Sequence, residues 1–271
     1  MSQLYYYSAA TKHGGFGELW RYRGLLKNLV AREIKVRHRQ SVLGMAWAVL
    51  SPLITTTVLA LIFSGFFGRG MGQARFALYV LTGLVLWNLF SAGTALGLVS
   101  IQGAGTIIRK VYVPRSIFPL AAVLSSLVNF AFSLISLAAY MAVTHARVHW
   151  ITLLAIVPVL EMTVFSLGIS MLLATMFVYF RDVRWFYDSA LLAMFYASPI
   201  FYPPEIIADK FAHVLRFNPL WSVLASFRSC IIDCKLPLAS DVVFGSISAL
   251  IALVVGWVIL RRFEQNLINY L

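Results

Sequence analysis

The chain has 271 residues, of which 61% are hydrophobic and only 12% are charged, and its mean hydropathy is +0.84. Soluble domains are roughly 45–50% apolar and about 25% charged, so this composition excludes a soluble globular protein and predicts an integral membrane protein. A net charge of +12 would suggest a nucleic-acid partner for a soluble protein. Here the basic residues are explained as flanks of membrane helices, and we expect membrane lipid, not nucleic acid, as the partner.

Residues 17–40 carry apolar side chains at helical spacing and basic side chains at most remaining positions. This pattern predicts an amphipathic helix that is too charged to span a membrane. The first long apolar run begins directly afterwards, near Gly44, so we expect the helix to lie in an anionic membrane surface. The alternative is an ordinary solvated helix.

Long apolar segments recur along the rest of the chain, and a helix needs about 20 such residues to cross a bilayer. We therefore predict an all-α integral membrane protein, with residues 1–271 as one domain and a six-span core over 44–262. The predicted spans are 44–67 (kinked at Pro52), 76–101, 117–143, 151–180, a segment that starts near residue 185, and 243–262. With the N-terminus inside, 15 of the 22 Lys and Arg residues are cytoplasmic, so the positive-inside rule predicts that both termini are cytoplasmic.

The segment "ASPIFYPPE", residues 197–205, ends the fifth span with three prolines. Proline removes a backbone donor, and a broken helix is tolerated at membrane depth only where it is buried in protein or lines a cavity. Two short amphipathic helices are predicted to follow, one over 205–217 and one that starts at "NP", 218–219. We therefore predict a re-entrant region over 198–232 on the outer side; the alternative is a plain external loop with surface helices.

Aromatic residues make up 14% of the chain, and several lie near span ends or beside this break. An aromatic belt at the membrane interface is one interpretation. The other is a path for sugars, whose apolar faces stack on aromatic rings. The candidates are Trp87, Phe90, Phe195, Tyr196, Phe201, Tyr202 and Trp221.

The segment "GTIIRKVYVPR", 105–115, predicts a short helix lying across the membrane surface after the second span. Ile107, Ile108 and Val111 form its apolar stripe, and Pro114 ends it. Arg109, Lys110 and Arg115 are expected to point outward. It either couples to a partner protein or is a basic loop that only sets the topology.

The sequence shows no recognisable enzyme motif. The sequence contains no GxxxxGK[ST] motif, so we expect no P-loop, no catalytic residue and no cofactor in this chain. Scattered histidines and two cysteines predict no metal site. Cys230 and Cys234 either pair in an oxidising compartment or are two unrelated small residues. Glu161, inside the fourth span, is a functional candidate by its place alone; alternatively it faces a watery cavity or is hydrogen-bonded between helices.

Four segments, in order, resemble those of type-2 ABC exporter permeases that move polysaccharides. They are "LVAREIKVRHRQSVLGMAWAVLSPL" (29–53), "IIRKVYVPRSIFPL" (107–120), "FVYFRDVRWF" (177–186), and "ASPIFYPPE" followed by "NPLW". The resemblance covers nearly the whole chain and is greatest to the O-antigen and teichoic-acid branch.

The resemblance implies a homodimer in a bacterial cytoplasmic (inner) membrane, two separate ATPase subunits that bind ATP and Mg, and a lipid-linked polysaccharide as substrate. It implies that the ATPase couples through Ile107, Ile108, Arg109, Lys110 and Arg115. It also implies that the N-terminal helix frames a lateral or cytoplasmic gate, with Trp20, Arg32, Lys35 and Arg37. The alternatives are an ABC-2 permease for a small molecule or drug, and a membrane scaffold that transports nothing.

Overall fold

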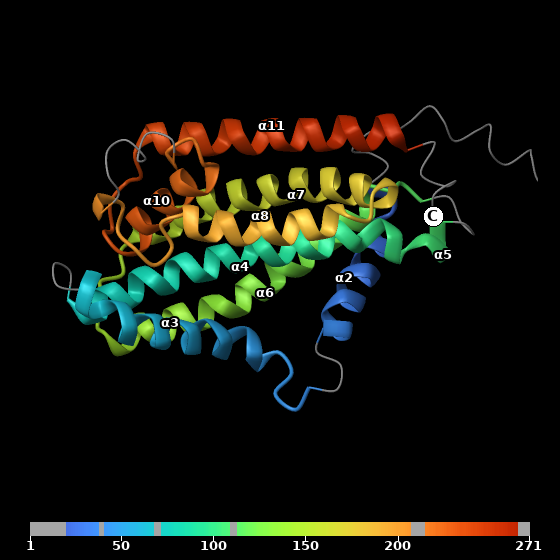
Figure 1. Ribbon diagram of the computed structural model, residues 1–271. Coiled ribbons are helices and arrows are strands. Elements are labelled where there is room, and N and C mark those ends of the chain that lie inside the picture. Colours follow the sequence, from blue (N-terminus) through green and yellow to red (C-terminus); the bar gives the residue numbers. More distant parts are fainter. Residues whose placement is uncertain (1–19, 38–40, 68–71, 109–112, 207–214, 265–271) are drawn as a thin grey trace, which may run out of the picture.

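The computed structural model describes residues 20–37, 41–67, 72–108, 113–206 and 215–264, and within them every regular element is a helix. Among these residues, five segments are long and apolar enough to span a membrane, which confirms the all-α membrane prediction. Figure 1 shows them as an elongated antiparallel bundle. They are α3 (Ala46–Phe67), α4 (Gln73–Gly103), α6 (Ile117–Val143), the 3-10 turn η1 (Trp150–Ala155) continuing into α7 (Ile156–Tyr179), and α11 (Ala239–Phe263).

The predicted fifth span, which starts near residue 185 and runs into the break at 197–205, corresponds to a short helix, α8. Helix α8 runs from Val183 to Ala197, and its 15 residues are about 22 Å long at 1.5 Å per residue. It lies antiparallel to α7 along the bundle (Figure 1) and ends where "ASPIFYPPE" begins. By length it does not reach across a bilayer, so the structure supports five spans and leaves the sixth a prediction.

The short helices lie at the two ends of the bundle (Figure 1). Helices α2 (Arg23–Arg37) and α5 (Gly105–Ile108) mark one end, called here the α2 end. The turn η2 (Pro204–Ile206) and helix α10 (Pro219–Ile231) mark the other, the α10 end. Helix α10 starts at the predicted "NP", because Asn218 Oδ1 accepts a hydrogen bond from the Leu220 amide at 3.0 Å and Pro219 fits the first turn. Most of the other predicted short helix, 205–217, lies outside the described residues.

Helix α2 forms within the predicted amphipathic segment 17–40. Leu29, on its apolar face, is only 7% exposed and packs in a cluster with Ile101 of α4 and Phe118 of α6. Protein therefore covers part of the face that the sequence assigned to lipid. Figure 1 shows α2 set at a steep angle to the long helices.

Small residues bring α7 and α11 into close contact. A Cβ on Gly168 of α7 would overlap the backbone of Ala252 in α11, and one on Gly256 of α11 would overlap the backbone of Gly168. Such small-residue contacts are typical of membrane helix pairs, where close backbone packing replaces the hydrophobic drive. We call this contact the glycine seam.

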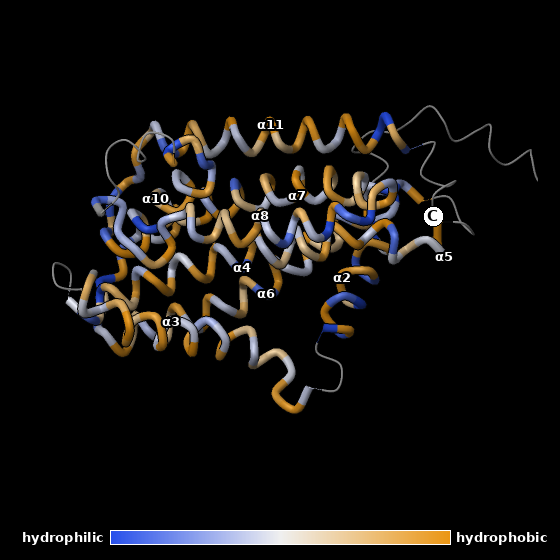
Figure 2. Tube along the Cα trace, viewed as in Figure 1, coloured by the Kyte–Doolittle hydropathy of each residue, from blue (hydrophilic) through white to orange (hydrophobic). Residues whose placement is uncertain are grey.

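Helix α3 is attached differently. Pro52 provides no backbone donor for the carbonyl of Ala48. The hydroxyl of Ser133, on α6, donates to that carbonyl at 3.0 Å and replaces the missing bond. Figure 2 shows apolar residues along the outward sides of both α3 and α11, as expected of helices that face lipid.

Candidate functional site

An aromatic cluster forms where α4 and α8 meet the helix break. The Trp87 ring lies 5.3 Å from that of Phe195 and 5.7 Å from that of Phe90. Phe195 in turn lies 5.8 Å from Phe201. These spacings are those of packed aromatic pairs. Residues from three separate segments therefore form one connected group of rings.

Further rings extend this cluster in both directions. Tyr196 and Tyr202 lie 6.1 and 5.2 Å from Phe201. Two rings that the sequence did not single out join them: Phe63 of α3 lies 5.5 Å from Phe201, and Phe165 of α7 lies 5.7 Å from Phe90. The cluster thus joins α3, α4, α7, α8 and the break.

The cluster passes from the protein interior to the surface. Phe90 is 2% exposed and Trp87 is 8% exposed, whereas Tyr196 is 59% exposed. A belt at the lipid interface accounts for an exposed ring such as Tyr196 but not for the buried ones. Trp221, the remaining candidate, is buried in α10 and lines a separate cavity of about 240 Å³ with Tyr79 and Arg228.

The helix break is held by a buried arginine. Arg228 of α10 is 6% exposed, and its guanidinium donates to the carbonyls of Pro199 (2.6 Å), Ile200 (2.9 Å) and Tyr79 (3.2 Å). The same guanidinium lies 3.5 Å from the centre of the Tyr79 ring, a cation–π contact. Arg228 thus provides donors for the carbonyls of Pro199 and Ile200, which the broken helix leaves without a backbone partner.

Tyr79 and two neighbours complete this arrangement. The Tyr79 hydroxyl donates to the carbonyls of Pro199 (3.2 Å) and Tyr202 (3.0 Å). A Cβ on Gly83, one turn further along α4, would lie 2.7 Å from the Arg228 guanidinium, so a side chain there would displace it. We call Tyr79, Gly83 and Arg228 the clasp. It explains how three prolines are accommodated at the end of α8.

A polar cavity of about 450 Å³ opens between α3, α4 and α6. Ser51, Asn88, Ser126 and Asn129 line it, and Arg37 and Trp47 lie at its edge. Asn129 Oδ1 is buried, and within the described residues it has no hydrogen-bond partner. Polar side chains inside membrane helices usually face one another or a watery space, and this cavity provides such a space.

Glu161 of α7 is buried against α11 and lies outside the aromatic cluster. Its Oε1 accepts a hydrogen bond from the Ser246 hydroxyl of α11 at 2.7 Å. Of the three roles considered from the sequence, the structure shows the hydrogen bond between helices.

The candidate coupling segment is described only in part. Helix α5 contains Ile107 and Ile108, and Ile108 is buried; Arg109 and Lys110 lie outside the described residues. The expectation that Arg115 points outward is wrong. Arg115 is 5% exposed, and its guanidinium pairs with Glu264, after α11, at 3.2 Å. A charge assumed to be solvated is instead used to join two distant segments.

The candidate gate residues lie at the α2 end, most of them on α2. Trp20 is 71% exposed, and the guanidinium of Arg23 lies 5.1 Å from its ring centre. Arg32, Lys35 and Arg37 are exposed. Among them, only Arg37 reaches the edge of the polar cavity.

Comparison with known proteins decides the family, because the profile of the ABC-2 type transporters matches residues 24–232. The chain belongs to the ABC-2 type transporter family. An ABC-2 relative, the O-antigen export system permease protein RfbA of Myxococcus xanthus, is 31% identical over 252 residues, which cover 92% of this chain and 95% of that protein. A protein of the same name from Klebsiella pneumoniae is 29% identical, covering 75% and 78% of the two chains. The polysialic acid transport protein KpsM of Escherichia coli is 23% identical, covering 89% and 94%.

Sequence reasoning missed Arg228, which makes three side-chain hydrogen bonds to backbone carbonyls in this ABC-2 chain. In the predicted topology Arg228 is one of the seven basic residues on the outer side, and no further role is predicted for it. A signal was present, because Arg228 follows Leu224 by four residues and therefore lies on the apolar face of α10. Asn88 and Asn129, polar residues in the middle of apolar spans, gave a similar signal for the cavity.

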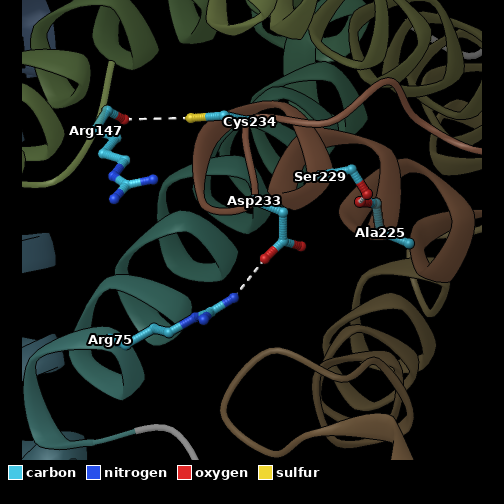
Figure 3. Close-up of polar contacts among 6 residues, drawn as sticks. All are labelled: Arg75, Arg147, Ala225, Ser229, Asp233 and Cys234. Atoms are coloured by element: carbon cyan, nitrogen blue, oxygen red, sulfur yellow. Dashed lines mark hydrogen bonds and ion pairs between the residues drawn. The ribbon is translucent and has the colours of Figure 1, made fainter. Parts of the chain in front are cut away.

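The two cysteines are free. Cys230 is fully buried, and burial raises the pKa of its thiol, which lowers its reactivity. The Cys234 thiol donates to the carbonyl of Arg147 at 3.3 Å (Figure 3). In this structure each cysteine therefore has its own surroundings, as the second of the two interpretations expected.

Proposed function

We propose that this chain is the membrane subunit of an ATP-driven exporter that moves a lipid-linked, O-antigen-like polysaccharide across the bacterial cytoplasmic membrane. The observation that carries the proposal is the 31% identity to the Myxococcus xanthus O-antigen export permease over 95% of its length. Two copies of this chain form the channel, and two ATPase subunits bind ATP and Mg.

Surface glycan in a deletion strain tests the substrate. Deletion of the chain should abolish surface polysaccharide and leave lipid-linked polysaccharide inside the cell. Normal surface glycan together with sensitivity to a drug would instead support a small-molecule exporter. Co-purification of an ATPase subunit distinguishes both exporters from a scaffold.

The aromatic cluster is proposed as part of the glycan path. It supports this role because it extends from buried Phe90 to exposed Tyr196 and crosses the break at Phe201. Stacking of a base on an aromatic ring is worth about 1–3 kcal/mol, and we expect weaker contacts for sugars, which would let a chain slide. Trp221 belongs to the path only if the substrate reaches the cavity beside the clasp.

Alanine substitutions test the path. Phe195→Ala with Phe201→Ala should slow export while the complex stays assembled. Phe66→Ala is the matched control, because Phe66 is an aromatic residue of α3 that is 78% exposed. Equal export rates in the double variant and the control would contradict the glycan path and leave the rings a packing role.

Coupling to the ATPase is proposed for the segment that begins with α5. The Arg115–Glu264 pair supports it, because it ties this segment to the end of α11 and so gives motion a route into the bundle. Charge reversal at Arg109 and Lys110 should weaken ATPase docking. A Gly/Ser linker in place of residues 106–112 that still exports normally would contradict the assignment.

The α2 end is proposed to be cytoplasmic, with both termini on that side and α2 framing a gate. The described basic residues support this orientation, because most of them lie at the α2 end. Cysteines introduced at Arg184 and at Lys235, in a chain without native cysteines, should be labelled from opposite sides. Labelling of Arg184→Cys from outside intact cells would contradict the proposed orientation and place the α2 end outside.

A further inference from the structure

An apolar groove and a basic cavity meet at the α10 end of the bundle. The groove, of about 940 Å³, runs between α6, η1, α7 and α10. The cavity beside it, of about 1000 Å³, lies over the α6–η1 loop and the turn after α10. Ala146 and Val148 line both, so the two spaces lie next to each other.

The groove opens to the membrane. Leu134, Leu153 and Ile156 line it, and they are 37%, 78% and 57% exposed. Trp150, 62% exposed in the first turn of η1, marks the height at which this helix leaves the hydrocarbon, because exposed tryptophans gather at that boundary. The groove therefore lies among lipid tails, and the basic cavity lies at the level of lipid headgroups.

Positive charge is concentrated in the cavity. Arg75, Arg147 and Lys235 line it, and Asp233 is its single acid. Asp233 pairs with Arg75 at 2.5 Å (Figure 3). Within the described residues Arg147 and Lys235 form no ion pair. Two cations are thus left without a counter-charge at the head of an apolar groove.

We propose that this composite site binds an anionic phospholipid of the surrounding membrane, with an acyl chain in the groove and the phosphate at Arg147 and Lys235. Charge complementarity selects this occupant, because a zwitterionic lipid brings its own cation next to the phosphate, whereas an anionic lipid does not. Basic pockets between membrane helices bind anionic headgroups, and each Lys or Arg near a membrane surface contributes about 1 kcal/mol to such attraction. The proposal does not depend on glycan export.

Lipid retention by the purified full-length chain tests whether Arg147 and Lys235 bind the lipid phosphate. Phosphatidylglycerol and phosphatidylcholine are titrated separately, and bound lipid is counted by native mass spectrometry. At about 1 kcal/mol per cation, or roughly five-fold in affinity, Arg147→Gln with Lys235→Gln should weaken phosphatidylglycerol binding at least ten-fold and leave phosphatidylcholine unchanged. Arg147→Lys should bind as the wild type does, and Arg181→Gln with Arg184→Gln, at the other end, controls for net charge.

A matched pair of variants tests the groove. Ala138 lines it, whereas the adjacent Ala139 does not, and both are exposed. Ala138→Trp should fill the groove and reduce phosphatidylglycerol binding, and Ala139→Trp should not. Thermal unfolding of each variant checks that it is folded.

Three results would overturn the proposal. One is equal phosphatidylglycerol binding by the wild type and the double Gln variant. Another is displacement of phosphatidylglycerol by a polyprenyl phosphate at much lower concentration, which would make the site one for a lipid carrier. The third is cross-linking of Ala138→Cys to itself in membranes, which would make the groove an interface between two copies.

Discussion

Helices α3 and α11 look alike in composition and exposure but are attached to the bundle by different means. In each, only 17% of the most apolar 18-residue stretch is buried. Helix α11 meets α7 backbone to backbone at the glycine seam, whereas α3 is connected through side chains, among them the Ser133 hydroxyl and the Phe63 ring. Exposure therefore does not measure attachment: α11 is held by backbone contacts at the glycine seam, and we predict that α3 is held less tightly.

The largest expected effect is at the seam. Gly256→Leu should lower the free energy of unfolding by about 3 kcal/mol or prevent assembly, because the clash is with backbone that cannot rotate away. Gly65→Leu, on α3, is the matched control, since a Cβ there has no atom within 4 Å. Thermal and denaturant unfolding of the purified chains measure both. Equal loss in the two variants would erase the distinction between α3 and α11.

The clasp is an attachment of intermediate strength. Arg228→Met should cost about 2 kcal/mol, because it leaves buried carbonyls without donors while removing a charge that was expensive to bury. Hydrogen exchange at residues 198–206 should rise with it. Arg216→Met removes the same charge from an exposed position and should change neither quantity. Unaltered exchange in Arg228→Met would show that the prolines alone hold the break.

Substitution of two serines tests one hydrogen bond of α3 and one of α11. Ser133→Ala removes the bond to Ala48 of α3, and Ser246→Ala removes the bond from α11 to Glu161. Bonds of this kind between membrane helices are worth about 0.6 kcal/mol on average and up to about 1.7. We expect faster hydrogen exchange in α3 for the first variant and little change in α11 for the second, because the seam still holds α11. Faster exchange in α11 would show that the seam is not sufficient.

The smallest effect is expected from the Arg75–Asp233 pair, whose side chains are 57% and 40% exposed. Exposed ion pairs contribute about 0–1 kcal/mol and are screened by salt. Arg75→Gln should therefore lower stability by less than about 1 kcal/mol at low salt and by nothing measurable at high salt. A loss that persists at high salt would give this pair a structural importance comparable to that of the clasp.

Much of the fold could be predicted from the sequence, since hydrocarbon requires long apolar helices and the sequence must display them. The predicted span 117–143 has the same bounds as α6, and 44–67 differs from α3 by two residues. The prolines also mark the break, beside which the aromatic candidates lie together, while their role in a substrate path stays a prediction. The family, known only by resemblance at first, is now established by the match over 24–232.

The features that the sequence did not predict depend on contacts between residues far apart in the chain. Nothing local distinguishes Gly168 from the other 16 glycines, because only the approach of α11 requires it. Arg115 was assigned to the surface since charges are usually solvated, but its partner, Glu264, is 149 residues away. Helix α8 has the 15 residues that the predicted start near 185 and the break at 197–205 allow, so the sixth span stays a prediction.

The ring contact between Phe63 and Phe201 connects α3 to the helix break. Arg228 holds the carbonyls of Pro199 and Ile200 beside α4. Phe201, the next residue, packs against Phe63 of α3 and against Phe195 of α8. We predict that a displacement of α3 separates the Phe63 and Phe201 rings while Arg228 keeps its hydrogen bonds to the break, because those bonds come from α10. The aromatic cluster would then respond to a movement of α3 before the clasp does.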